Sequence, residues 1–483
     1  MPAELEALLV EGRVALDGGE WVVARASFDA VLAEGENPEA LLGLSDALWW
    51  LGDTEGAVRC GERAYAAFRR RRDLVSAALA AVTLYFHYRV SLGNAAAAQG
   101  WLGRAARLVE EFELAPLRGW VLLMRAHNTR DPGAAERWAR EARELACTYE
   151  DADLDLCALS QLGVSLVEMG RVEEGECLLD EAMAASLGGE CENLRTVVYT
   201  SCNMISACSQ VAGIERAAQW IHAGDEFARR YGSPHLYTTC RTYYGTILFE
   251  TGDWAEAERQ LTAALAGAKS AERALYAEAL ARLAELRLAQ GRLDEAERLL
   301  AGFEDESSCA STLAAICLAR GDPVGAETVL NRRLHELERP ERAGPYPAGA
   351  SACLEAAGLL ELLAAAQLEQ GALGEARTTV ARLVELGEQA GCEVIIARSA
   401  RAVGRALAAE EEPEAAVREL ESALVAFARL GLRLETARTH LLLADVVRDR
   451  RASVREARAA LDAFESLGAG SDADRGGPSP LAR

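Results

Sequence analysis

The sequence is poor in the features that mark secreted, membrane-spanning or zinc-binding proteins. No apolar run approaches the roughly 20 residues needed to cross a bilayer. The acidic N-terminal stretch 1–6 lacks the basic-then-apolar layout of a signal peptide. The 12 cysteines include no Cys-x-x-Cys pair and no Cys/His cluster with zinc-finger spacing. These absences favour a reducing, cytoplasmic setting with unpaired thiols.

Catalytic motifs are missing as well. Nothing resembles a Gly-x-Ser-x-Gly, His-Glu-x-x-His or EF-hand pattern, and the stretch 267–270 lacks the Gly that precedes the Lys of a phosphate-binding loop. The six histidines are scattered over separate segments, where a lone histidine is more often a structural residue than a ligand. The sequence therefore predicts no enzyme activity, no cofactor and no metal.

Lysine is nearly absent, and acidic residues dominate the charge. Lys269 is the only lysine, and 75 acidic residues against 51 basic ones give a formal net charge of −24. Nucleic-acid affinity depends on neutralising phosphates, and anionic membrane surfaces also repel acidic chains. We therefore expect no direct nucleic-acid binding by this chain alone and no membrane contact.

One pattern is present in quantity: a Gly, five residues later an Ala, and four residues after that a bulky apolar residue. It recurs at intervals of about 39 residues, a period typical of solenoids built from stacked helix pairs. The Ala (or Gly) of the copies lies at positions 24, 57, 98, 135, 175, 218, 257, 296, 326, 376, 416 and 457. A generic Ala-rich bundle would show only the helical period of 3.6 residues. The pattern predicts an all-α, right-handed superhelical solenoid of about twelve helix-turn-helix repeats.

The copy around Ala257 shows why these residue types recur. We expect one helix before Gly252 and another after Asp253. Glycine adopts the left-handed conformation that ends a helix, and aspartate caps the next helix. Ala257 then lies on the inner face of the second helix, where a larger side chain would separate the two backbones. Leu261 is one turn further along the same stripe.

These positions resemble the tetratricopeptide repeat, although the unit is about six residues longer than the usual ~34. It is similar to the extended version in the regulatory region of maltose-type and other LuxR-family transcription activators of bacteria. Residues 227–258 resemble the centre of that region in actinobacterial LuxR-type regulators, and residues 463–475 resemble the segment that leads into their helix-turn-helix. The resemblance implies a regulatory scaffold. The family's DNA-reading residues have no counterparts in this sequence.

Composition predicts where the array is interrupted. Residues 339–350 contain three prolines and two glycines, which rule out a continuous helix. We therefore expect repeats 1–9 over residues 1–338, a loop or hinge over 339–350, and repeats 10–12 over 351–467. Residues 468–483 lack periodicity and are expected to form a disordered tail.

Polar and aromatic residues on the first helix of each pair are the candidates for a binding surface, because in paired-helix arrays these helices line the concave face. Two groups interrupt the apolar stripe, and Arg and Tyr are among the side chains that most often anchor interfaces. The candidates are Tyr85, His87, Tyr88, Arg89, Tyr237, Arg241 and Tyr243. The alternative that half of each group packs between helices stays open.

Together these features predict a non-catalytic interaction and regulatory protein whose concave groove receives a protein segment or a small signalling ligand. Two alternatives remain. One is the sensing part of a DNA-binding regulator whose helix-turn-helix is missing from this chain, and the other is an enzyme with an unrecognised site inside the superhelix. Leu5, Leu8, Leu9 and Val10 also give the first repeat an apolar edge, which predicts either self-association or cover by a helix of another protein.

Overall fold

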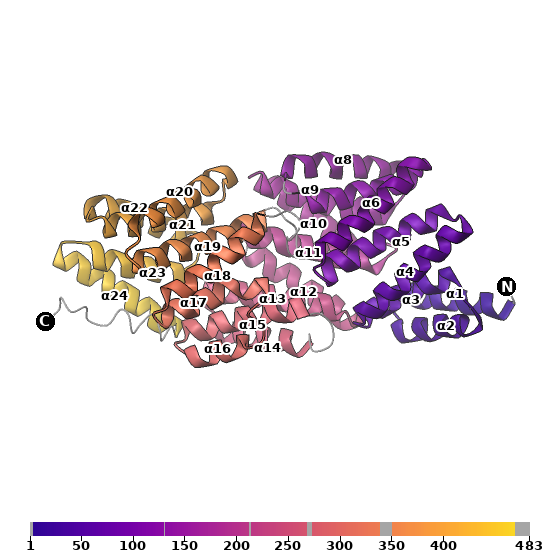
Figure 1. Ribbon diagram of the computed structural model, residues 1–483, viewed down its shortest axis with the longest axis horizontal. Coiled ribbons are helices and arrows are strands. Elements are labelled where there is room, and N and C mark those ends of the chain that lie inside the picture. Colours follow the sequence, from indigo (N-terminus) through magenta and orange to yellow (C-terminus); the bar gives the residue numbers. More distant parts are fainter. Residues whose placement is uncertain (1–2, 130, 212–213, 268–272, 339–349, 469–483) are drawn as a thin grey trace.

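A computed structural model describes residues 3–129, 131–211, 214–267, 273–338 and 350–468. Over these residues the chain forms 24 α-helices and no strand (Figure 1). The first half contains α1 (Ala3–Asp17), α2 (Trp21–Glu34), α3 (Pro38–Trp50), α4 (Thr54–Arg71), α5 (Leu74–Phe86), the π-helical turn η1 (His87–Ser91), α6 (Ala95–Glu111), α7 (Ala115–Asn128), α8 (Pro132–Tyr149), α9 (Ala152–Glu168), α10 (Val172–Gly188), α11 (Leu194–Val211) and α12 (Ile214–Tyr231). The second half contains α13 (Pro234–Thr251), α14 (Trp254–Gly267), α15 (Arg273–Ala289), α16 (Leu293–Leu300), the 3-10 turn η3 (Ser307–Cys309), α17 (Ala310–Ala319), α18 (Pro323–Leu337), α19 (Ala350–Glu369), α20 (Leu373–Ala390), α21 (Glu393–Ala409), α22 (Pro413–Arg429), α23 (Arg433–Val446) and α24 (Arg450–Leu467).

The junction of α13 and α14 has the predicted repeat geometry. Gly252 ends α13 with φ of +99°, and the Asp253 side chain accepts a backbone hydrogen bond of 3.2 Å that caps α14. Ala257 and Leu261 are both 0% exposed. A Cβ added to Gly245 of α13 would lie 2.7 Å from Leu261 Cγ, so the absence of a side chain there lets the two helices pack closely.

Two copies of the pattern have a register different from the predicted one. In α12 the predicted small residue is Ala218, but the side chain that packs inside, at 1% exposure, is that of Ala217. Helix α12 begins one residue earlier in its repeat than α14 does, so its buried small position also comes one residue earlier. In α24 the cap is Asp449, which accepts a backbone hydrogen bond of 3.1 Å. Ser453 therefore holds the position of the small residue, and the predicted Ala457 lies one turn too far along the helix.

The predicted interruption separates α18 from α19, and these two helices pack against each other. Residues 339–349, which carry most of the predicted hinge, lie outside the described residues, as do residues 469–483 of the predicted tail. The hinge, the tail and the division of the array at this point stay predictions.

The helix pairs wind into two successive turns, and the first turn comprises α1–α12. Trp21 at the start of α2 donates a hydrogen bond from Nε1 to the carbonyl oxygen of Tyr231 at the end of α12 (2.5 Å). Arg195 of α11 forms an ion pair of 2.8 Å with Asp46 of α3. The sixth helix pair therefore contacts the first two pairs, and the first turn closes on itself.

The second turn, α13–α24, closes in the same way. Leu467 at the end of α24 lies beside Gly252 and belongs to one buried cluster with Trp254, and α13 packs against α23. In the first turn, Tyr231 lies beside Gly19 in the corresponding manner. Packing of α11 against α19 joins the two turns. Figure 1 shows the indigo N-terminal helices and the yellow C-terminal helices at opposite ends of the long axis.

Candidate functional site: the inner face of the second turn

The first group of predicted site residues lies in the closed interior of the first turn. Tyr85 at the end of α5, and His87 and Arg89 in η1, are at most 1% exposed. The Tyr85 hydroxyl donates to the Met124 carbonyl oxygen (3.4 Å), and His87 Nε2 lies 3.4 Å from the Ser45 hydroxyl. These three side chains are packed between helices, and a ligand-binding role for them stays a prediction.

The histidines of this interior are held uncharged by burial. Desolvation lowers the pKa of His87 well below its usual value and lowers the pKa of His127 to about 4. The His127 ring packs near Phe86 and Tyr199, with centroid distances of 6.4 and 5.7 Å. The interior of the first turn is therefore an aromatic core with neutral imidazoles, closed to solvent.

Three further predicted residues contact neighbouring helices. The Tyr88 hydroxyl donates to a carboxylate oxygen of Glu62 in α4 (2.8 Å). Arg241 of α13 pairs with Asp225 of α12 (3.0 Å), bonds to α14, and places its guanidinium 4.3 Å from the centre of the Tyr237 ring. These contacts tie α12, α13 and α14 together, and a ligand-binding role for Tyr88, Tyr237 and Arg241 stays a prediction.

Charged side chains of the second turn act on Tyr243 of α13, and a ligand-binding role for this residue stays a prediction. Desolvation raises the pKa of its hydroxyl well above the usual value, and Glu278 and Arg282 of α15 act on it electrostatically. Glu355 of α19 acts on it as well. Its neighbourhood therefore extends over three first helices of the second turn.

Charged side chains from five first helices meet on this inner face. Glu361 of α19 accepts bonds from Arg398 and Arg401 of α21 at 3.1 and 2.7 Å. Arg401 also pairs with Glu435 of α23. We use the name inner charge cluster for Glu250, Glu278, Arg282, Glu285, Glu361, Arg398, Arg401 and Glu435. The ion pairs join α19, α21 and α23, and the side chains of α13 and α15 act on this part of the cluster electrostatically.

Two carboxylates of this cluster, Glu250 of α13 and Glu278 of α15, have no ion pair or hydrogen bond within the described part of the chain. Glu250 is exposed, yet desolvation raises its pKa to about 7, against the opposite effect of Arg398. Desolvation also raises the pKa of Glu278. Water reaches such a side chain, but protein surrounds it on several sides, so it lies on a concave surface. Its charge is weakly screened there. Such carboxylates favour a cationic group.

None of the residues of the inner charge cluster is among the predicted site residues. The sequence does contain a signal for this cluster, because opposite charges lie one repeat apart on the first helices of successive pairs. Glu361 and Arg401, for example, are 40 residues apart. Within the described ranges, no group of three or more His, Cys, Asp or Glu side chains could hold a metal ion. The helices of those ranges also include none with the length and apolar character of a membrane span.

No family model matches the chain, and no curated protein matches it. Three solved structures are similar to it over most of their length. They are the anaphase-promoting-complex hetero-tetramer Cut9–Hcn1 (14% identity, 98% of this chain and 96% of that chain, TM-score 0.40), a Rap protein complexed with competence and sporulation factor (15%, 80% and 99%, 0.41), and the apo quorum sensor NprR from B. thuringiensis (15%, 74% and 99%, 0.43). At these values the similarity concerns only the general fold.

The helix pairs, their glycine turns and their small-residue contacts decide the fold class. The chain is a tetratricopeptide-like helical solenoid.

Proposed function

We propose that this protein is a regulatory interaction module that receives a segment of another protein on the inner face of its second turn. Glu250 and Glu278 carry the proposal, because among the described residues they have no ion-pair partner, beside a network in which Glu361, Arg401 and Glu435 are paired. A Lys or Arg side chain of the bound segment would supply the missing positive charge through a charge-assisted hydrogen bond.

The regulatory part of the proposal rests on the resemblance of residues 227–258 and 463–475 to LuxR-type regulators. In this interpretation the chain is the sensing region, and it acts in the cytoplasm. The net charge of −24 also favours basic partners, because it attracts them before contact is made.

The proposal is tested with the tagged full chain and a native cytoplasmic extract. We expect the wild-type protein to recover a protein partner, and Glu250→Gln/Glu278→Gln to reduce that recovery about tenfold, because loss of a weakly screened charge pair raises the dissociation rate. Recovery by the wild type is also expected to fall with added salt.

Glu34→Gln/Glu111→Gln is the matched control, because it removes the same charge from two exposed side chains of the first turn. Its recovery of the partner should equal that of the wild type. Equal recovery by both double variants would contradict a role for Glu250 and Glu278.

Valine side chains are exposed close to the predicted N-terminal edge, where Leu5 and Leu8 are half-buried. Leu9 is buried, but Val10, Val14 and Val22 are 54, 65 and 70% exposed on α1 and α2. Exposed apolar patches on a soluble chain are typical of interaction surfaces. The second part of the proposal is that this edge pairs with its counterpart in another copy of the chain.

Self-association should disappear when charge is placed on the edge. We expect Val14→Glu/Val22→Glu to sediment as a monomer at concentrations where the wild type forms dimers, because two buried carboxylates per copy strongly oppose association. Val324→Glu/Val425→Glu changes two valines that are 61 and 68% exposed elsewhere, and it should remain dimeric. A monomeric wild type would contradict the prediction.

A further inference from the structure

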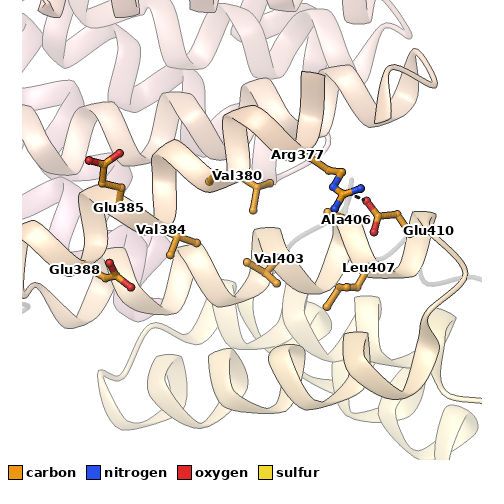
Figure 2. A pocket seen from close by; sticks show the side chains of 10 residues that line it. Arg377, Val380, Val384, Glu385, Glu388, Val403, Ala406, Leu407 and Glu410 are labelled. Atoms are coloured by element: carbon orange, nitrogen blue, oxygen red, sulfur yellow. Dashed lines mark ion pairs between the residues drawn. The ribbon is translucent and has the colours of Figure 1, made fainter. Parts of the chain in front are cut away.

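A groove with an apolar floor lies between α20 and α21, and Figure 2 shows it from close by. It has a volume of about 400 Å³, within the range of ligand-binding sites. Its floor is formed by Val380 and Val384 of α20 and by Val403 and Leu407 of α21. Three of these side chains keep part of their surface exposed, whereas Val380 is 7% exposed. We call this feature the α20–α21 groove.

The α20–α21 groove is separate from the inner charge cluster. Leu407 follows Arg398 by nine residues on α21, which is two and a half helical turns, so the two side chains point to opposite sides of the helix. Arg398 belongs to the inner face. The groove therefore lies on the other side of α21, and its occupant does not compete with a segment bound to Glu250 and Glu278.

Charge is distributed unevenly along the groove. At one end, Arg377 of α20 pairs with Glu410 of α21 at 3.3 Å, so these two charges cancel. At the other end, Glu385 and Glu388 are exposed carboxylates, and Glu385 accepts a hydrogen bond from the neutral Gln389 (3.0 Å). Figure 2 shows both carboxylates at the end of the groove away from the Arg377–Glu410 pair. The groove is thus apolar along its length and negative at one end.

We propose that the α20–α21 groove binds an amphipathic helix of a partner protein, with basic residues at the end that lies over Glu385 and Glu388. The floor repeats at helical spacing over Arg377 to Glu388, a length of about 16 Å or three turns. Two neighbouring helices with apolar residues in this arrangement form the groove into which the side-chain ridge of a third helix packs. An amphipathic helix recognises such a groove through apolar anchors three or four residues apart.

The charge of the groove specifies the orientation of the helix. Positive side chains beside Glu385 and Glu388 gain Coulomb energy, whereas the neutralised Arg377–Glu410 end offers none. A helix with its basic residues at the opposite end would bury apolar anchors equally well but would lose this attraction. Orientation therefore depends on charge and affinity depends mainly on apolar contact.

The test uses the full chain and a pair of designed, fluorescently labelled amphipathic helices. Both carry leucines at the anchor positions, and one carries three arginines at one end where the other carries three glutamates. We expect the arginine helix to bind the wild type at least about tenfold more tightly than the glutamate helix. Glu385→Arg/Glu388→Arg should reverse this preference.

Ala381→Trp is a second variant, because Ala381 lines the groove and an indole there would fill it. Binding of both helices should be lost, while circular dichroism stays that of the wild type. Glu34→Arg/Glu111→Arg makes the same charge change on the first turn and should leave the preference unchanged. The proposal is overturned if Ala381→Trp binds the arginine helix as the wild type does, or if Glu385→Arg/Glu388→Arg keeps the wild-type preference.

Discussion

Replacement of Arg401 by methionine is expected to lower the free energy of unfolding by about 3 kcal/mol or more, as measured by urea denaturation. Arg401 is 6% exposed and Glu361 is 8% exposed, so both charges are almost fully removed from water. Removing one partner of a buried pair leaves the other charge desolvated and uncompensated. Arg398 at 3.1 Å still partners Glu361 in the variant, which places the expected loss near the lower end of the usual range.

The effect should depend on pH in a defined direction. Burial alone would raise the pKa of Glu435, but Arg401, with Arg438 and Arg398, holds it well below its usual value of 4.5. A carboxyl whose pKa is lower in the folded state contributes stability above pH 4.5, and this contribution is lost as the pH falls below that value. In Arg401→Met this contribution is smaller. The difference in the free energy of unfolding between wild type and variant should therefore decrease as the pH falls from about 6 to about 3.

Two controls separate buried charge from charge in general. Arg448→Met removes an arginine whose pair with Glu414 is 73% exposed on both sides, and it should cost no more than about 1 kcal/mol. Arg401→Met/Glu361→Met should recover part of the loss, because it also removes the buried carboxylate that has lost Arg401 as a partner. If Arg401→Met/Glu361→Met has a clearly lower free energy of unfolding than Arg401→Met, the buried-charge explanation is wrong.

The repeat could be predicted from sequence because each unit depends on residues that are close along the chain. Gly252, Asp253, Ala257 and Leu261 specify a turn, a cap and a packing stripe within ten residues, and the structure has all of them. The wrong register at Ala457 has a local cause: this copy has no glycine to mark its turn, since Ala452 stands five residues before Ala457, and the helix begins at its Asp449 cap.

The candidate site could not be predicted in the same way, because it depends on how distant helices meet. The interior that encloses Tyr85 and His87 belongs to a turn that closes through Trp21 and Tyr231, which are 210 residues apart. Glu250 is likewise surrounded by charges from α15, α21 and α23. Helical periodicity indicates which side of a helix is apolar. It does not indicate which other helices face the polar side.

Replacement of Gly175 by alanine is expected to destabilise the protein by about 2 kcal/mol, although alanine is the residue at this position in most copies of the repeat. A Cβ at Gly175 would lie 2.6 Å from the Gly163 carbonyl oxygen and 2.9 Å from the Val167 backbone nitrogen. Backbone atoms cannot rotate away as a side chain can, so α9 and α10 would have to move apart. The two glycines allow a closer helix crossing here than alanine does elsewhere.

The sign of this effect distinguishes packing from helix propensity. Alanine in a helix interior is favoured over glycine by about 1 kcal/mol when nothing is in the way. Gly103 of α6 has no atom within 4 Å of an added Cβ, so Gly103→Ala should raise the thermal midpoint while Gly175→Ala lowers it. If both variants were stabilised equally, α9 and α10 would have to be further apart in solution than the Gly163–Gly175 contact allows. The repeat would then tolerate alanine in every copy, and Gly175 would have no packing role.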